Sequence, residues 1–599
     1  MIKKNKKKYE IKFSEIVIRV LGMAFAAGPV YLIINNIIAV VNGVSQGVIT
    51  YVTQLFFNSV SMAISDNSSV NNVIIMAIAL ASTIILSQIV NGLNNFMGIS
   101  YFKKVLGYFN QKINIKASKI DPIAYENVET LDDINKASLG ANNSLGLLFT
   151  ITTIFSYYLP YFIFMFIYLY SLDPSLALAL IFVFVPVALS QFVRSIIFTK
   201  LEDEIAPLRR EYLYYGKQLA GKETRILGGG TYFKELLSTS VQLLNRATWK
   251  AEKKVGLLDL GMRFITVLGY LGIVFLFIRS LLKGNISVGA FAAVYASIDV
   301  MFGTMNAIIG THIANLSQNL GTIKNFVRFL KMPERVGEQA YPEKNNSVSI
   351  ENVSFYYPGS LSPSLDNISL KIAEGETIAI VGENGSGKST LVKILLGIYV
   401  PSTGIVKLAG QDTKKVDPSV LFKNVSAVFQ KFQKYKMTFK ENVEISDIRA
   451  KSNIGKIKSL SKEVGIDFQN ERFPEGENTM ISREFNGVEL SGGQWQRLAI
   501  ARGLYRNHNI IVLDEPTAAI DPIEELNVYN TFAEIAKDKT AIIVTHRLGS
   551  TKIADQIIVM EKGRIIEKGS HNELMNVKGK YMEMYRKQAE WYERDDISI

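Results

Sequence analysis

Cysteine is absent from this sequence of 599 residues. Its absence excludes a disulfide framework, a thiol nucleophile and a thiolate metal site, because each of these needs a cysteine sulfur. Acidic side chains are the minority among the charged ones, with 54 Asp and Glu against 66 Lys and Arg. A positive balance can indicate nucleic-acid binding, but beside long apolar runs a basic face towards anionic lipid explains it better.

The N-terminus lacks the pattern of a cleaved signal peptide. Residues 1–8 hold five lysines, and the apolar run that follows is too long and has no small-residue cleavage site. We therefore expect a retained N-terminus on the cytoplasmic side. Residues 13–21 have the apolar spacing of a short interfacial helix.

Six long apolar runs fill the first half of the sequence. Each exceeds the roughly 20 residues that cross about 30 Å of hydrocarbon, so we predict six transmembrane helices. A very large buried core is the alternative, and six such runs make it the poorer explanation. The runs cover residues 24–58, 72–100, 143–171, 174–199, 257–281 and 287–323.

The connections between these runs alternate in charge. The short ones carry few charged residues, whereas residues 101–140 and 200–256 are long and rich in Lys and Arg. The positive-inside rule places both long segments, and both termini, in the cytoplasm. Each long segment is broken by a turn, near residues 124–129 and 222–225, and we expect both turns to contact a cytoplasmic domain. Plain solvated hairpins are the alternative.

Polar side chains inside the predicted spans are candidates for substrate contact, because burying them in hydrocarbon is costly. Asp299 is the only carboxylate well inside a span, which makes it the first choice for lining a cavity. Hydrogen bonding between helices explains the asparagines at least as well, and packing explains His312 better than a proton relay. The candidates are Asn35, Asn36, Asn91, Asn94, Asn95, Arg194, Asp299, Asn306 and His312.

The clearest motif in the second half is the segment 378–390. Four apolar residues lead to Gly382, the pattern G-x-x-x-x-G-K-S follows, and a helical run begins at Thr390. A glycine-rich loop between a strand and a helix turns its N–H groups towards phosphate, Lys388 can reach the β- and γ-phosphates, and Ser389 can ligate Mg²⁺. The predicted nucleotide-binding residues of this loop are Gly382, Asn384, Gly385, Ser386, Gly387, Lys388, Ser389 and Thr390.

Two further apolar strands end in polar side chains. Residues 509–516 end in Asp514 and Glu515, and residues 540–545 are followed by His546. Ligands of open α/β sheets lie at the carboxyl ends of the strands, so we expect these side chains to meet the glycine-rich loop. Asp514 can hold Mg²⁺ opposite Ser389, and Glu515 can polarise the attacking water.

These motifs, with Leu-Ser-Gly-Gly-Gln at residues 490–494 followed by Trp-Gln-Arg-Leu-Ala-Ile-Ala-Arg, resemble the ATPase domain of ATP-binding cassette (ABC) proteins. The resemblance covers residues 347–590 closely. The six-span half resembles the membrane domain of ABC exporters more loosely, and residues 484–506 look most like bacterial half-exporters of peptides and bacteriocins.

The resemblance implies a role for each matching residue. Tyr357 stacks on adenine, and Gln430 senses Mg²⁺, as a third ligand beside Ser389 and Asp514, together with the attacking water. Glu515 is the general base and His546 is the γ-phosphate sensor. The residues implied to contact nucleotide across a subunit boundary are Ser491, Gly493, Gln494 and Asp521. A plain strand aromatic is the alternative for Tyr357, and a solvated surface amide is the alternative for Gln430.

Taken together, the sequence predicts a membrane all-α six-helix domain of the ABC exporter type (1–332), a linker (333–346) and an α/β P-loop NTPase domain (347–599). The expected function is ATP-driven export across the bacterial cytoplasmic membrane, with ATP and Mg²⁺ and without nucleic acid. We expect a homodimer that contacts membrane lipid and exports a peptide. A heterodimer, export of lipids or drugs, and an ATP-gated channel stay open as alternatives.

Overall fold

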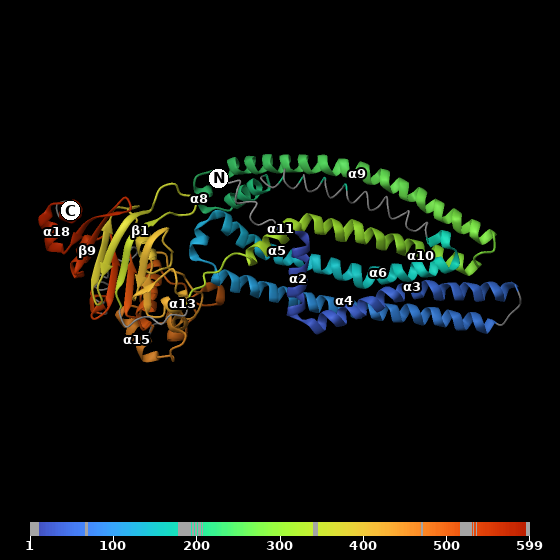
Figure 1. Ribbon diagram of the computed structural model, residues 1–599, viewed down its shortest axis with the longest axis horizontal. Coiled ribbons are helices and arrows are strands. Elements are labelled where there is room, and N and C mark those ends of the chain that lie inside the picture. The colour runs from blue at the N-terminus through green and yellow to red at the C-terminus, as the bar shows by residue number, and fades with distance from the viewer. Residues whose placement is uncertain are drawn as a thin grey trace. The chain divides into compact units, whose positions relative to one another are not determined.

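The computed structural model describes residues 11–65, 70–177, 193, 197, 201, 205, 208–338, 346–468, 471–515, 530, 532–534, 536 and 537–594. The chain divides into two compact units. The first comprises Met1–Ser118 and Asp132–Met332, and the second comprises Lys119–Leu131 and Pro333–Ile599. Each unit is described by itself below (Figure 1).

The first unit is helical. In chain order its helices are α2 (Phe13–Ala27), α3 (Pro29–Ser65), α4 (Val70–Lys119), α5 (Val128–Thr153), the π-helix η3 (Ile154–Tyr158), α6 (Leu159–Leu172), α8 (Lys222–Ile226), α9 (Gly230–Leu282), α10 (Val288–Asn306), the π-helix η4 (Ala307–Ile313) and α11 (Ala314–Leu330) (Figure 1). The helix α2 extends beyond the predicted interfacial segment and ends at Ala27, with Gly28 as its C-cap, and Pro29, which lacks an N–H, begins the next helix.

Five helical stretches in the described part of the chain are long and apolar enough to cross a membrane. They are Pro29–Ser65, Val70–Lys119, Lys136–Leu172, Gly230–Leu282 and Val288–Asn306. They correspond to five of the six predicted spans, and in the sixth run η4 and α11 continue α10. Most of the remaining predicted span, 174–199, lies outside the described residues, as does Arg194.

Helix α3 packs closely against η3 and α6 through two glycines one turn apart. A Cβ atom on Gly43 would lie 2.2 Å from the carbonyl oxygen of Tyr157, and one on Gly47 would lie 2.3 Å from the ring of Phe164. Small residues spaced by four positions let membrane helices approach to backbone contact. The two glycines therefore set the distance between these helices.

The second unit contains two sheets. The six-stranded sheet has the order β10-β9-β3-β8-β7-β6 and is parallel except for the β10–β9 pair, and the four-stranded antiparallel sheet has the order β2-β1-β4-β5. The strands are β1 (Val348–Phe355), β2 (Leu365–Ile372), β3 (Thr377–Gly382), β4 (Thr403–Leu408), β5 (Gln411–Asp412), β6 (Val425–Val428), β7 (Ile510–Asp514), β8 (Thr540–Val544), β9 (Gln556–Glu561) and β10 (Arg564–Gly569).

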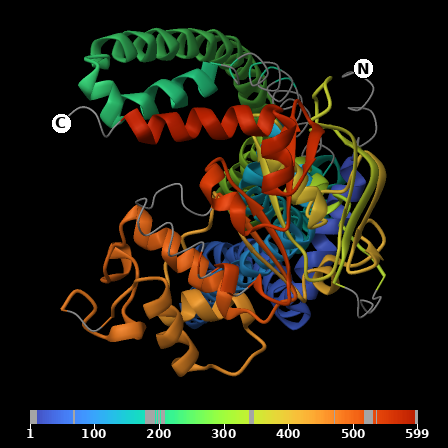
Figure 2. The ribbon, with the colours of Figure 1, turned by 90° about the vertical axis from the view of Figure 1, so that its left-hand side faces the viewer.

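Helices cover the parallel sheet on both faces, so its central strands are buried throughout, as their unbroken apolar runs require. Val512 and Val544 pack towards α12 and the antiparallel sheet, whereas Leu513 and Ile543 pack towards α16. Figure 2 shows the orange helices α14–α16 gathered to one side of the strands. The helices are α12 (Lys388–Leu395), α13 (Pro418–Leu421), α14 (Phe439–Glu444), α15 (Ile454–Glu463), α16 (Gly492–Tyr505), α18 (His571–Val577) and α19 (Lys580–Arg594).

The turn in the first long basic segment belongs to the second unit. Ile123, in the short helix η2 (Pro122–Glu126), packs against the core between the two sheets. The Glu126 carboxylate accepts a hydrogen bond of 2.5 Å from the Tyr399 hydroxyl and lies 3.6 Å from the Lys393 ammonium. The predicted contact of this turn with the domain after residue 333 is confirmed, and the second turn, at α8, stays a prediction.

Replacing Gly43 by alanine should destabilise the first unit, because the new methyl group collides with a backbone carbonyl that cannot rotate away. We expect a loss of about 1–3 kcal/mol, the usual cost of overpacking, seen as a lower thermal unfolding midpoint in detergent. Gly92→Ala on α4 is the matched control, since a Cβ there meets nothing within 4 Å. Equal midpoints for the two variants would contradict the proposed close packing.

Candidate nucleotide-binding site

Three parallel strands bring the predicted site together. β3 and β7 flank β8, with Ile380 and Asp514 both in register with Val544, so the three strands end at the same edge. Backbone hydrogen bonds continue the register past that edge, from the N–H of Glu515 to Val544 and from that of Thr545 to Ile380. The structure thus confirms the prediction that these strand ends meet.

The loop after β3 depends on glycine at two positions. Gly382 and Gly387 have φ angles of 153° and 103°. A Cβ atom would lie 2.3 Å from the Met560 carbonyl oxygen in the first case and 2.8 Å from the Ser364 carbonyl oxygen in the second. Only glycine satisfies both the backbone geometry and the space. The loop then opens helix α12, whose first N–H groups favour an anion.

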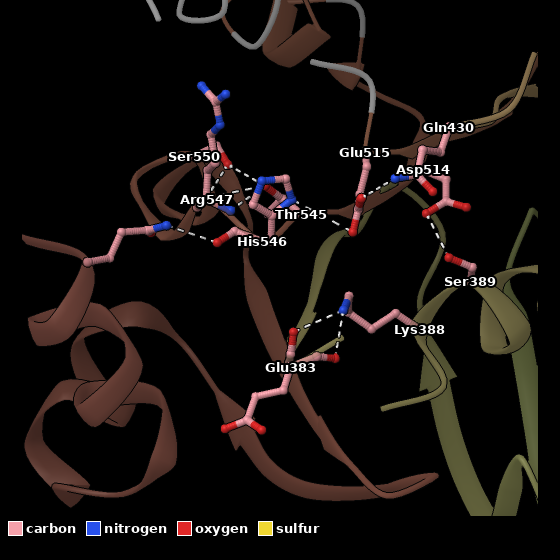
Figure 3. A network of polar contacts seen from close by, with 12 residues as sticks. Glu383, Lys388, Ser389, Gln430, Asp514, Glu515, Thr545, His546, Arg547 and Ser550 are labelled. Carbon is pink, nitrogen blue, oxygen red and sulfur yellow. Dashed lines mark hydrogen bonds and ion pairs between the residues drawn. The ribbon is translucent and has the colours of Figure 1, made fainter. Parts of the chain in front are cut away.

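Lys388 lies buried at the centre of this loop. Its ammonium donates hydrogen bonds to the carbonyl oxygens of Gly382, at 2.9 Å, and Glu383, at 3.0 Å (Figure 3). Burial lowers its pKa, and the carboxylates of Glu515 and Asp514 act in the opposite direction. The buried Ser386 hydroxyl has no hydrogen-bond partner among the described residues. A phosphate oxygen would satisfy it, so the loop fits a nucleotide.

Asp514 and Ser389 face each other across the strand ends. The Ser389 hydroxyl donates to a carboxylate oxygen of Asp514 at 3.3 Å (Figure 3). Burial first, and the negative charge of Glu515 second, raise the pKa of Asp514 to about 6. A buried carboxylate beside a hydroxyl is an oxygen donor set of the kind that Mg²⁺ prefers, so the pair fits that ion.

Glu515 points away from Asp514 and meets two other predicted residues. Its carboxylate accepts a hydrogen bond of 2.7 Å from the Gln430 side chain, and its other oxygen lies 3.7 Å from Nδ1 of His546 (Figure 3). The backbone of Glu515 has a φ of 48°, which is rare for a residue with a side chain. This turn is what separates two carboxylates that are adjacent in sequence.

An open pocket of about 1040 Å³ lies over the loop. One wall consists of predicted residues, among them Lys388, Ser389, Gln430 and Glu515. A second wall was missed, because no motif distinguishes its residues and only the folding of β2, β9 and β10 brings them here. Its residues are Ser362, Pro363, Ser364, Asp366, Glu561, Lys562, Gly563, Arg564 and Ile566. Arg564 and Asp366 on this wall form an ion pair of 2.5 Å.

Tyr357 lies beside the pocket and is not among the residues that line it. Its hydroxyl forms a hydrogen bond of 3.1 Å with Thr390, and its ring contacts that of Phe355 edge-on at 5.1 Å. Stacking of Tyr357 on adenine therefore stays a prediction.

The Leu-Ser-Gly-Gly-Gln motif does not line this pocket either. Ser491 caps α16, accepting from the Gln494 N–H at 3.3 Å, and the Gln494 side chain accepts from the Ser491 N–H at 3.0 Å. Gly493 follows in the first turn of the same helix. A single chain thus uses the motif to cap its own helix. Asp521 lies outside the described residues.

Comparisons with known proteins agree with this geometry. Residues 365–518 match the family model described as ABC transporter. The chain is 30% identical to the subtilin transport ATP-binding protein of Bacillus subtilis over 578 residues, which cover 91% of this chain and 90% of that protein. It is 37% identical to the nisin transport ATP-binding protein of Lactococcus lactis over 251 residues, 42% of each chain.

The chain is also similar to a lipid flippase and to a solved structure of an exporter. The ATP-dependent lipid A-core flippase of Nitrosococcus oceani is 31% identical over 369 residues, 61% of each chain. The solved structure of a bacterial Atm1-family ABC exporter with ATP bound superposes with a TM-score of 0.76 at 21% identity, covering 96% of this chain and 98% of that one. The predicted fold class is confirmed by this similarity.

The raised pKa of Asp514 gives a test of the buried carboxylate. The pKa of Asp514 in the folded state, about 6, exceeds the usual 3.8. The Asp514 carboxyl group therefore contributes to folding stability below pH 3.8, and this contribution is lost as the pH rises through 6. Asp514→Asn should therefore stabilise the protein at pH 8, by at most about 3 kcal/mol, and much less at pH 4.5. Thermal unfolding in buffer free of nucleotide and magnesium measures the difference.

Asp538→Asn is the control for this comparison. Asp538 is exposed and has a φ of 64°, a conformation that asparagine tolerates. The thermal unfolding midpoint of this variant should therefore equal that of the wild type at both pH values. If the unfolding midpoint of Asp514→Asn at pH 8 is no higher than that of the wild type, burial does not disfavour the ionised form of Asp514.

Proposed function

The chain belongs to the ABC transporter family and couples ATP hydrolysis to export across a membrane, and on this premise we propose that two copies work together on a peptide substrate. The observation that supports a peptide most strongly is the similarity to the subtilin transport protein over nine-tenths of the chain. Lys388 and Glu515 line one pocket, and Asp514 and His546 contact residues that line it, which supports turnover at each copy.

In the proposed reaction each side chain has a separate task. Lys388 and the loop N–H groups hold the phosphates, and Ser389 with Asp514 hold Mg²⁺, which supplies positive charge to the phosphate oxygens when bound. Glu515 accepts the proton of the attacking water, because its carboxylate faces the pocket and Gln430 fixes its direction. His546 lies on the other side of the same carboxylate and contacts the γ-phosphate.

The need for two copies follows from the position of the Leu-Ser-Gly-Gly-Gln motif. Ser491 is exposed at the N-terminus of α16 and does not line the pocket of its own chain. In the family, this motif acts on ATP held by a partner, so we propose that Ser491, Gly493 and Gln494, with Asp521, complete the site of a second copy. A partner chain of different sequence is the alternative.

The membrane location is supported by the apolar helices, and we propose the bacterial cytoplasmic membrane with both termini inside. The segment Lys119–Leu131 packs with the ATP-binding unit, so this turn lies on the side where ATP is found. That side agrees with the Lys and Arg content of the two long segments.

Replacing Glu515 by glutamine tests the catalytic role. The amide keeps the shape of the side chain but cannot accept the proton, so hydrolysis of MgATP should fall by at least about 10²-fold, while ATP binding is retained. Phosphate release and equilibrium binding of ATP measure the two effects. Glu463→Gln, at the exposed end of α15, should hydrolyse ATP like the wild type. Undiminished phosphate release from Glu515→Gln would refute the assignment.

Peptide export and lipid export can be distinguished by asking which substrate accelerates ATP hydrolysis. Lipid export is the second candidate, because a lipid A-core flippase is among the similar proteins. The protein is placed in liposomes made from one phospholipid mixture, and either a peptide or lipid A is added. We expect the peptide to raise the ATPase rate several-fold and lipid A to leave the rate unchanged. Stimulation by lipid A alone would reverse the choice between the two candidates.

A further inference from the structure

The last membrane stretch of the first unit carries a polar face. Helices α10 and α11 continue one another through η4 (Figure 1), and Asp299, Asn306, Thr311 and Asn315 are exposed along them. By contrast, α4 exposes large apolar side chains such as Leu86, which is 62% exposed. A face with a carboxylate and two amides is too costly to solvate with hydrocarbon, so it requires water or protein instead.

The π-helical turn keeps this face continuous. In an α-helix, five residues rotate the chain by about 140° relative to the starting side, so Thr311 would point away from Asn306. A π-helix bonds residue i to residue i+5, so Thr311 is turned back towards the side of Asn306, and Asn315 follows in α11. The turn is also held by His312, whose Nε2 bonds to the Tyr158 hydroxyl at 3.2 Å and whose ring packs against Phe149.

Asp299 stands in an aromatic surrounding on this face. Tyr295, one turn earlier on α10, is 55% exposed, and the ring of Tyr270 on α9 meets that of Phe302, three residues after Asp299 on α10, at 5.8 Å. Within the described part of the chain, no lysine or arginine forms a salt bridge with Asp299. A carboxylate on the same face as an exposed tyrosine ring can attract an ammonium or guanidinium group by charge and by cation–π interaction.

We propose that this face lines an aqueous path through the membrane and that Asp299, with Tyr295 and Tyr270, binds a positively charged group of the transported peptide. The inference rests on the proposed export of peptides and adds the class of substrate, a cationic peptide with lysine or arginine side chains. Asn306, Thr311 and Asn315 continue the path with hydrogen-bonding groups that suit the peptide backbone.

The absence of cysteine allows the path to be tested without background labelling. Single cysteines replace Asp299, Asn306, Thr311 and Asn315 in the full-length protein in proteoliposomes, which are treated with a charged methanethiosulfonate reagent. All four should react. Leu86→Cys and Phe275→Cys, whose parent side chains are 62% and 64% exposed but apolar, should not react because lipid covers them. If the four cysteines do not react, because lipid or a second copy covers them, the aqueous path is overturned.

Charge selectivity is tested with a lysine-containing peptide and its lysine-acetylated analogue. The measured quantity is the concentration that gives half-maximal stimulation of ATP hydrolysis. For the wild type it should be about tenfold lower for the charged peptide, which corresponds to about 1.4 kcal/mol. Asp299→Asn should abolish this ratio, Asp299→Glu should keep it and Asp299→Lys should invert it. The ratio is taken within each variant, so differences in folding or expression cancel.

Failure of this inference can be told from failure of the proposed function. Equal stimulation of the wild type by both peptides, or an unchanged ratio in Asp299→Asn, overturns the cation site and leaves peptide export standing. Stimulation by neither peptide, in protein that hydrolyses ATP, overturns both.

Discussion

One backbone turn at the end of β7 organises the catalytic chemistry of this chain. Asp514 and Glu515 are adjacent in sequence, and their charges would repel each other in a common environment. The φ of 48° at Glu515 sends the two carboxylates to different partners, Asp514 to the buried Ser389 and Glu515 to Gln430 and His546. Adjacent acids can therefore serve a metal and a water molecule separately, and the cost is a backbone conformation that the surrounding sheet must hold in place.

The sequence predicted those parts of the site in which each position has a local physical reason. Gly382 and Gly387 are required by backbone contacts, and the polar ends of β7 and β8 follow from the edge where parallel strands end. The pocket wall around Arg564 was not predictable, since it arises from pairing between strands distant in sequence. The π turns escaped prediction too, because an apolar run has no pattern that marks one extra residue in a turn.

A short packed path connects the Lys119–Leu131 turn with the nucleotide loop inside the second unit. Glu126 bonds to Tyr399, whose ring stacks on Phe355 at 5.7 Å and meets Tyr357 edge-on at 6.1 Å. Tyr357 in turn bonds to Thr390 at the start of α12. Close-packed interiors have low compressibility and transmit strain. Glu126, whose turn interrupts the first unit in sequence, is thus joined to Thr390 through two side chains, Tyr399 and Tyr357.

The capping box of α16 bears on the proposed engagement of a second copy. Ser491 and Gln494 satisfy each other's backbone N–H groups within one chain. A donor at an exposed helix end is otherwise satisfied by water. Here the two side chains fix the first turn of α16 before any second copy binds. A surface that is already ordered loses little conformational entropy on binding. The proposed pairing can therefore form and separate again without folding or unfolding this helix end.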